Sequence, residues 1–329
     1  MQYCFDNFTD CFQTLVKKVY QNYDFISAPR GMSVKETLGV SFEITNPRNR
    51  LLYVKSRKFS LDYMIAECLW YLSGNNETKW ISKYSKFWSN ISDDGIHANS
   101  AYGHRIFTSG SDNVSRSFSN GQFISQWNHV KNELSQDPDS RRAVIHIKMP
   151  TDSQYKLDVP CTLTLQYFIR NNKLYAITNM RSTDIIFGLS YDVPAFTFLQ
   201  ELMALELGVE LGTYKHLSNS LHVYERHFDM CKDIIDKSKE SYASNTIQQM
   251  DPIICKPNVD MLMKCENEIT TASEKDLLNI KRKYNIDDNF WQDWITILLA
   301  RKAKKLKLNS MYDFFINDLN FSGYKCVVK

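Results

Sequence analysis

Apolar residues recur at helical spacing in four long stretches, and this pattern predicts helices with one face in the core. The stretch between Ser60 and Gly74 has both expected ends, because serine is a good N-cap and glycine is a common stop. The last stretch has an almost continuous apolar face, which is typical of a buried helix. The four stretches are 5–22, 61–73, 122–136 and 193–209.

Apolar-rich segments bounded by turn residues predict strands between these helices. Asn171 and Asn172 separate two such segments, and asparagine tolerates the positive φ of a tight turn, so a hairpin is expected there. A second pair of strands is expected on either side of Asn46 and Pro47. The strand segments are 38–45, 49–56, 143–149, 163–170 and 173–181.

The rest of the chain predicts a loop and further helices. Residues 108–121 are polar and rich in glycine and serine, so we expect an exposed loop. Beyond His227 the helical pattern is rich in Lys and Asp, and the basic run 301–307 is expected to be a solvated helix end rather than a phosphate site. These elements indicate an α+β fold, a mixed β-sheet covered by helices with an additional helical C-terminal region. The expected division is a catalytic core, 1–230, and a helical extension with its tail, 231–329, packed on the core as a single domain.

Composition narrows the class of protein. Hydrophobic residues make up 43% and aromatic residues 13% of the 329 residues, enough for a full core, so disorder is not expected. The formal charge of +3 is too small to favour nucleic acid or an anionic membrane as the main partner. The eight cysteines include no CxxC pair, which favours reduced thiols, and no metal is expected. An acidic amino terminus unlike a signal peptide, and the lack of an apolar run of roughly 20 residues, predict a cytoplasmic protein.

The segment PCTLTLQ, residues 160–166, raises a chemical question about Cys161. A lone cysteine in an apolar strand is usually inert packing. Its context favours chemistry, because arginines occur in DPDSRR and MRSTD, and guanidinium groups are preferred ligands of phosphate. A cationic pocket would also lower the pKa of the thiol and supply thiolate as a nucleophile.

Together these motifs resemble the thymidylate synthase superfamily, and most closely its deoxycytidylate hydroxymethylase branch. The resemblance runs from Arg30 to His227, roughly two thirds of the chain. It implies a thymidylate synthase-like sheet, a pyrimidine nucleoside monophosphate as substrate and 5,10-methylenetetrahydrofolate as co-substrate. The motifs that carry it are, in order, Arg30, ECLWYLSG, SAYG, DPDSRR, PCTLTLQ, NMRSTDIIFGLSYD and LHVYERH.

The resemblance implies catalytic roles for Cys161, Glu67, Tyr102 and Asp192. Cys161 would add to C6 of the pyrimidine, because C5 is too electron-poor to attack an electrophile until the ring becomes an enamine. Glu67 would organise water and shuttle protons, including the one that leaves C5. Without the motif, Glu67 would be read as an ordinary exposed helical glutamate. Tyr102, in SAYG, lies beside the nucleophile in relatives.

The resemblance also implies a cationic phosphate site. In the family the paired arginines of DPDSRR come from the partner subunit, so a symmetric homodimer with shared active sites is implied. The implied phosphate ligands are Arg30, Arg141, Arg142, Arg181 and Ser182.

Sugar and folate positions complete the implied site. His222 and Tyr224 match residues that hydrogen-bond the sugar 3′-hydroxyl, and their i, i+2 spacing puts them on one face of a strand. Gln166, in the nucleophile motif, is a further expected substrate ligand. A tryptophan in a helix is normally packing, but Trp88 matches a position near the folate pterin, as do Asp184 and Gly188.

Two positions at which this chain differs from the synthases indicate which base is bound and which product is formed. Eleven residues after Arg181 the synthases carry an asparagine that pairs with uracil, and this chain has Asp192. A carboxylate accepts from the exocyclic amine of cytosine, but it has no donor for uracil O4, so cytosine is favoured. The alternative is that Asp192 only caps the following helix. Thr162, where synthases usually have histidine, is associated with the hydroxymethylases.

Three functions therefore stay open. The first is folate-dependent hydroxymethylation of dCMP, favoured over CMP because Arg142 and Ser182 resemble the deoxynucleotide enzymes. The second is thymidylate synthase, which methylates dUMP. The third is a catalytically dead regulator that binds nucleotides or RNA, and the intact Cys161, Glu67 and arginines oppose it.

Overall fold

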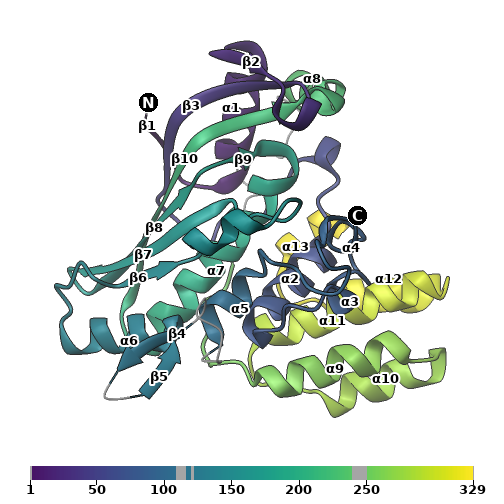
Figure 1. Cartoon of the computed structure of the whole chain (residues 1–329). Coiled ribbons are helices and arrows are strands. Elements are labelled where there is room, and N and C mark those ends of the chain that lie inside the picture. The colour runs from purple at the N-terminus through teal and green to yellow at the C-terminus, as the bar shows by residue number, and fades with distance from the viewer. Residues whose placement is uncertain (1, 109–115, 120–121, 239–249, 329) are drawn as a thin grey trace.

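The computed structural model describes residues 2–108, 116–119, 122–238 and 250–328, and its centre is one mixed β-sheet (Figure 1). The strand order is β1-β3-β10-β8-β7-β6, with β2 paired to β3 and β9 paired to β10. The β1/β3, β10/β8 and β10/β9 pairs are parallel, whereas the others in this sheet are antiparallel. The strands are β1 Gln2–Phe5, β2 Phe25–Ser27, β3 Val34–Ile44, β6 Val144–His146, β7 Thr162–Arg170, β8 Lys173–Met180, β9 Thr183–Asp184 and β10 Glu210–Tyr224.

Helices cover one face of the sheet, and this α+β arrangement is the one expected. The helices α1 (Phe8–Gln21), α6 (Gln126–Gln136) and α7 (Ser190–Leu207) pack directly on the strands. On the opposite face, alternate residues stay partly exposed, among them Phe168, Tyr175 and Ile177. The sheet therefore has one face in the core and one face with apolar side chains open to contact.

A second helical layer lies on α7 and carries half of the candidate site. α2 (Leu61–Ser73) packs against α7 and α5 (Tyr102–Phe107). A Cβ at Gly103 would lie 2.2 Å from Tyr71 Cα, so only glycine lets α5 approach α2 this closely. The short helices α3 (Thr78–Ile81) and α4 (Phe87–Ile91) belong to this layer, whereas α8 (Phe228–Asp236) packs against α1.

Two sequence predictions are confirmed in detail, and a third is corrected at one end. The helix expected from 61 to 73 is α2, and Gly74 follows it with a φ of 64°. The expected hairpin joins β7 to β8, with Asn171 and Asn172 at φ angles of 51° and 59°. The first helix begins at Phe8 rather than residue 5, because the residues before it pair with β3 as β1.

Two predictions about strands and loops are wrong. The expected strand 49–56 does not form, because Thr9 Oγ1 donates to Leu51 O (3.1 Å) and accepts from Tyr53 N (3.0 Å) in place of a strand ladder. The expected loop 108–121 contains a strand, β4 (Arg116–Ser119), which pairs with β5 (Gln122–Ser125). The rest of that loop, 109–115 and 120–121, lies outside the described residues.

The C-terminal helices pack on the core through aromatic and polar contacts. The Phe198 ring of α7 lies 5.0 Å from the Trp294 ring of α11, between centroids. Glu266 of α9 accepts hydrogen bonds from Trp80 Nε1 and Tyr84 Oη, both at 2.8 Å. The division at residue 230 stays a prediction. These helices are α9 Val259–Thr271, α10 Glu274–Lys283, α11 Asn289–Lys305, α12 Asn309–Asn317 and α13 Ser322–Val328.

None of the helices found in the described ranges has both the length and the apolar character that crossing a bilayer requires. The basic run 301–307 ends α11, and there Lys302 Nζ donates to Thr270 O (2.7 Å).

Candidate active site

Cys161 lies in the bend just before β7, and Arg181 holds that bend in place. Arg181 donates from Nε to Pro160 O and from Nη2 to Val159 O, both at 2.9 Å. Its Nη2 lies 3.5 Å from Cys161 Sγ. Because Arg181 follows the end of β8, the hairpin itself brings this guanidinium to the thiol. The cysteine is partly accessible rather than sealed in the core.

The expectation that a cationic pocket lowers the pKa of Cys161 is wrong. Burial raises the pKa of the thiol, and the carboxylates of Asp192 and Asp158 raise it further. Arg181 and Arg30 act in the opposite direction but do not outweigh burial. The thiol therefore needs a proton acceptor, or a substrate-dependent change, before it reacts as thiolate.

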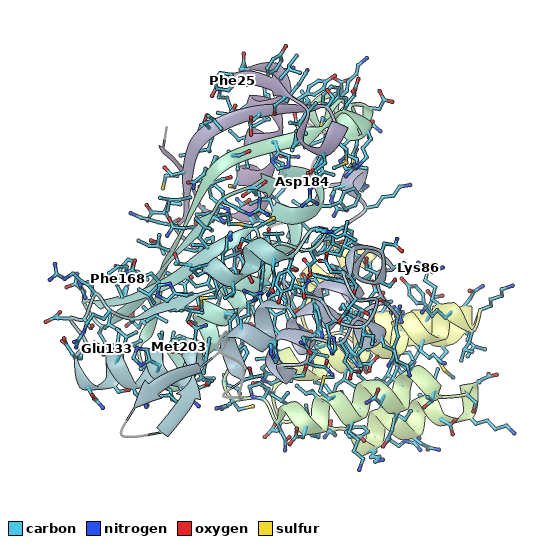
Figure 2. The ribbon with its side chains drawn as sticks, in the orientation of Figure 1. Phe25, Lys86, Glu133, Phe168, Asp184 and Met203 are labelled. Atoms are coloured by element: carbon cyan, nitrogen blue, oxygen red, sulfur yellow. The ribbon has the colours of Figure 1, made fainter. Side chains whose placement is uncertain are left out.

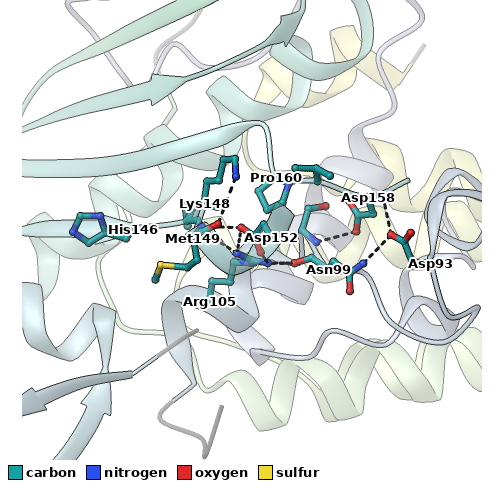
Figure 3. Close-up of polar contacts among 12 residues, drawn as sticks. Asp93, Asn99, Arg105, His146, Lys148, Met149, Asp152, Asp158 and Pro160 are labelled. Carbon is teal, nitrogen blue, oxygen red and sulfur yellow. Dashed lines mark hydrogen bonds and ion pairs between the residues drawn. The ribbon is translucent and has the colours of Figure 1, made fainter. Parts of the chain in front are cut away.

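A polar network fixes the segment that leads into Cys161 (Figure 3). The Asp93 carboxylate accepts from the backbone N–H groups of residues 156–158 at 3.0–3.1 Å. Arg105 forms a buried two-bond pair with Asp152, at 2.8 and 2.9 Å, and donates to Ile147 O. Paired buried charges of this kind are costly to break, so they hold the backbone in front of the nucleophile.

Glu67 projects from α2 and is held by a tyrosine that the sequence reading missed. Tyr63 Oη donates to Glu67 Oε1 (2.8 Å), and Trp88 Nε1 donates to Tyr63 Oη (3.0 Å). Burial raises the pKa of Glu67 to about 7, and the hydrogen bond from Tyr63 opposes that rise. A carboxyl with this pKa can accept and return protons at neutral pH. The i, i+4 spacing of Tyr63 and Glu67 on a helix was the signal available in the sequence.

Asp192 lies in the first turn of α7 with a partly accessible side chain. Its pKa is raised well above its usual range by burial and by the charges of Glu67 and Asp184. The alternative that it caps the helix is wrong, because Leu189 occupies the N-cap and Asp192 makes no capping hydrogen bond. Within the described residues, no donor reaches its carboxyl group.

Tyr102 and the first residue of β7 meet beside the nucleophile. Tyr102 Oη accepts a hydrogen bond from Thr162 N (3.3 Å). The Tyr102 ring lies 5.8 Å from the Tyr71 ring, between centroids, across the close α2/α5 contact. Burial raises the pKa of Tyr102 well above its usual range, and negative charge on Cys161 and Asp192 raises it further, so the phenol stays protonated as a potential donor.

The expected sugar ligands lie together at the other end of the site. His222 is in register with Asp184 of β9 on one side and with Glu36 of β3 on the other. The His222 and Tyr224 rings meet edge to face at 5.1 Å, and burial lowers the pKa of His222. Glu36 was not predicted, because only the strand pairing brings it beside His222.

Arg30 lies at the rim of the site. It has a φ of 54° and its Nη1 donates to Leu157 O (3.2 Å), within the segment fixed by Asp93. Its charge lowers the pKa of Cys161, so it acts on the same site as Arg181. Ser182 follows Arg181 directly in the chain, before β9.

The structure does not bring Arg141, Arg142 or Gln166 to this chain's Cys161. Gln166 Nε2 donates to Arg141 O (2.9 Å) in the middle of β7. Arg142 pairs with Glu133 (2.8 Å), and its side chain is 77% exposed. Figure 2 shows Glu133 well apart from Asp184. Both arginine side chains are exposed, so each can contact another molecule, Arg142 by leaving Glu133.

Gly188 and Asp184, the residues of the expected folate wall, lie together beside Asp192. A Cβ at Gly188 would lie 3.5 Å from Asp192 Oδ2 and 3.7 Å from Asp184 Cβ, so Gly188 is directly beside both carboxyl groups. Asp184 Oδ1 accepts from Ile186 N (3.0 Å) and so fixes the π-helical turn Ile185–Leu189. No group of three or more His, Cys, Asp or Glu side chains suited to a metal ion occurs in the described part of the chain.

Comparisons with known proteins agree with the resemblance seen in the sequence. The family model described as thymidylate synthase matches residues 10–263. Deoxyuridylate hydroxymethyltransferase of Bacillus phage SP01 is 32% identical over 220 residues, covering 66% of this chain and 57% of that protein. The enzyme of the same name from Delftia phage PhiW-14 is 31% identical over 220 residues, covering 63% and 57%. Thymidylate synthase of Fusobacterium nucleatum subsp. nucleatum is 30% identical over 197 residues, covering 59% and 68%.

The chain spans somewhat more than half the length of the two phage hydroxymethyltransferases that it matches. The region matched by the family model includes every residue expected in the site and extends into α9.

Proposed function

Because the chain belongs to the thymidylate synthase family, we propose that it is a one-carbon transferase that hydroxymethylates C5 of a cytidine monophosphate, with dCMP favoured over CMP. The observation that carries the proposal is Asp192. Its carboxyl group faces the same site as Glu67 and Gly188, and no described residue donates to it. A partly accessible carboxyl group without a donor can pair with a ligand that enters the site.

Cys161 and Glu67 divide the chemistry between them. Cys161 Sγ adds to C6 of the ring, and the electron pair that this addition releases makes C5 nucleophilic. Arg181, 3.5 Å from Sγ, stabilises the thiolate that attacks. Methylenetetrahydrofolate supplies the one-carbon unit for C5. Glu67, with its pKa of about 7, accepts the C5 proton as the folate nitrogen leaves, and it orients the water that then adds to the one-carbon unit. Cys161 Sγ leaves C6 as the C5–C6 double bond forms again.

The residues expected to hold folate fit a pterin in part. The partly exposed Asp184 carboxylate can accept from the N–H donors of a flat ring. Trp88 is 8% exposed, its indole N–H already donates to Tyr63, and its ring packs on Trp70. We infer that Trp88 supports the folate wall through Tyr63 and Trp70 more than it stacks on the pterin.

The choice of base depends on the ionisation of Asp192. An ionised Asp192 accepts from the cytosine amine and from protonated N3, but it offers no donor to uracil O4. A neutral Asp192 has one donor and one acceptor, like an amide, and can pair with either base. The two phage relatives are named for deoxyuridylate, and this favours hydroxymethylation of dUMP as the second candidate.

Selectivity for cytosine is expected to rise with pH. The pKa of Asp192 is raised, so the group is neutral below that pKa and ionised above it. Uracil loses its donor on ionisation, whereas cytosine N3 is basic enough to take up a proton from solvent on binding, so the cytosine–carboxylate pair keeps that proton to a higher pH. The ratio of kcat/KM for dCMP to kcat/KM for dUMP, measured from about pH 6 to about pH 9, should increase. A ratio that falls with pH contradicts this account of the site.

Tritium release and folate oxidation test the proposed reaction. With methylenetetrahydrofolate, the protein should release tritium from [5-³H]dCMP to water, because every route through C5 substitution expels that proton. Dihydrofolate should not form, since water rather than hydride completes the reaction. Dihydrofolate formation with dUMP would identify a thymidylate synthase instead. The absence of tritium release from every pyrimidine monophosphate would favour the third hypothesis, a catalytically dead regulator.

The two exposed arginines support a homodimer with shared sites. Arg141 and Arg142 lie away from their own Cys161, and the open sheet face beside them carries Phe168 and Ile177. A second copy packed on this face could bring its arginines to the phosphate.

Mixing two inactive variants tests this sharing. The Arg141→Ala/Arg142→Ala and Cys161→Ala variants should each be inactive. The mixed population from co-expression should regain about a quarter of the wild-type sites, because about half of its dimers are heterodimers and each of these has one site with an intact thiol from one subunit and intact arginines from the other. A monomer in solution, or heterodimers without activity, would contradict the shared site. Each variant carries its own affinity tag, and equal amounts of the two tags in the purified dimers serve as the control for mixing.

A further inference from the structure

A directional hydrogen-bond chain runs from Trp88 through Tyr63 to Glu67. An indole N–H is only a donor, so Trp88 Nε1 must donate to Tyr63 Oη (3.0 Å). The single phenol proton is then free to point at Glu67 Oε1, 2.8 Å away. The hydrogen-bond chain therefore presents the Tyr63 hydroxyl as a donor to the carboxyl group of Glu67, whatever the tautomers of other groups.

We propose that Tyr63 is a positioning residue that fixes Glu67 and keeps its carboxylate available as the proton acceptor for the reaction at C5. The proposal rests on the proposed function for the chemistry that Glu67 performs, but the hydrogen bond acts on Glu67 in the free protein as well. Its effect can therefore be read without turnover.

Packing holds the phenol in the geometry that this role needs. The Tyr63 ring meets the Tyr191 ring edge to face at 4.7 Å. Tyr191 Oη in turn accepts from Ser60 N (3.1 Å) at the start of α2. Trp88 is itself fixed against Trp70, with 4.9 Å between the ring centroids. Tyr63 thus has its ring and its hydroxyl held from α7 and α4, while its backbone belongs to the helix that carries Glu67.

The hydrogen bond offsets part of the cost of burying Glu67. Burial raises the pKa of Glu67, and donation from Tyr63 stabilises the ionised form and lowers that pKa. The other titratable groups that face Glu67 are few in the described residues. Cys68 and Tyr71 come from α2 itself, and Tyr191 and Asp192 come from α7. Of these, only Asp192 is a second carboxyl group, so its titration must be separated from that of Glu67.

Tyr63→Phe is the direct test, because it removes one oxygen and leaves the packed ring. A hydrogen bond to a charged group is strong enough that its loss should raise the pKa of Glu67 by about one unit or more. The pKa of Glu67 is measured by ¹³C NMR of the side-chain carboxyl carbons in protein labelled at glutamate, titrated without ligand. Glutamate labelling leaves aspartate silent, and the Glu67→Gln variant identifies the Glu67 signal. Repeating the titration in an Asp192→Asn background removes the coupling between the two carboxyl groups.

The chain offers a matched control in Tyr84→Phe. Tyr84 also donates to a buried glutamate, Glu266, at 2.8 Å, and a tryptophan N–H from Trp80 reaches the same carboxylate. This second cluster joins α9 to the core, outside the candidate site. Tyr84→Phe should leave both the Glu67 titration and the pH profile of tritium release unchanged, although it removes the same kind of bond.

Two outcomes separate this inference from the proposed function. An unchanged Glu67 titration in folded Tyr63→Phe protein overturns the role of Tyr63, even when the wild type is active. A wild type without tritium release overturns the proposed reaction, while the titration still reports on Tyr63. In an active enzyme, the loss in Tyr63→Phe should be largest below neutral pH and recover as pH rises. A loss that is equal at every pH would mean that the tyrosine only supports the fold.

Discussion

Cys161→Ala is expected to abolish tritium release from [5-³H]dCMP, with a loss of more than about a thousandfold. No other described thiol lies against Arg181, so nothing replaces the bond from sulfur to C6 that activates C5. The change removes one atom at a partly accessible position, so the fold and nucleotide binding should persist. Stopped-time tritium assays measure the loss, and calorimetric titration with dCMP measures the retained binding.

Cys255→Ala is the matched control, because that thiol is exposed and lies near Asp288 instead of an arginine. It should keep full activity. If Cys161→Ala released tritium at a rate close to that of the wild type, the covalent route would be excluded. If instead the Cys161→Ala variant lost all binding of dCMP, the cysteine would have a structural role that the geometry does not suggest.

Asp192→Asn is expected to transfer preference from dCMP to dUMP. An amide donates to uracil O4 and accepts from N3–H, as in the synthases, so dUMP gains the donor that an ionised Asp192 lacks, whereas dCMP loses the charge-assisted hydrogen bond from protonated N3. An unmade hydrogen bond to a buried group costs about 1–3 kcal/mol, so the ratio of kcat/KM for the two substrates should change by about tenfold or more. Competition assays with both nucleotides measure this ratio directly.

The pH dependence of selectivity should also vanish in Asp192→Asn, because an amide does not titrate. This second readout separates base pairing from a general loss of charge near Glu67. A variant with the same preference as the wild type, at any pH, would mean that Asp192 does not contact the base.

Residues within recognisable motifs were predictable from the sequence, because the fold gathers those motifs at one place. Cys161, Arg181 and Tyr102 come from three motifs and meet around the bend before β7. Glu67 and Asp192 come from two further motifs. In addition to burial, the charge of Glu67 raises the pKa of Asp192 and of Tyr191 across the α2/α7 contact. The roles of these residues stay predictions until the variants are measured.

Properties that depend on burial could not be read from local patterns. The raised pKa of Cys161 results from the loss of solvent around the thiol, which outweighs the nearby guanidinium groups. The pairing of Glu36 with His222 depends on the β3/β10 register, and a sequence without alignment does not give it. Tyr63 stood at helical spacing from Glu67, but only tertiary packing adds the hydrogen bond from Trp88.

The errors in the fold have the same origin. Residues 51–54 are apolar and look like a strand, but Thr9 satisfies their backbone groups from another element. Residues 116–119 look like a polar loop, and yet pairing with β5 makes them a strand. In both cases a contact from elsewhere in the chain overrides the local preference.

The most direct test of the whole account is the mass of the product formed when equimolar dCMP and dUMP compete for the wild-type protein in the presence of methylenetetrahydrofolate above neutral pH. A nucleophilic Cys161 and an ionised Asp192 predict 5-hydroxymethyl-dCMP as the main product, without dihydrofolate. Accumulation of 5-hydroxymethyl-dUMP or dTMP, with dCMP left unchanged, would contradict the role given to Asp192.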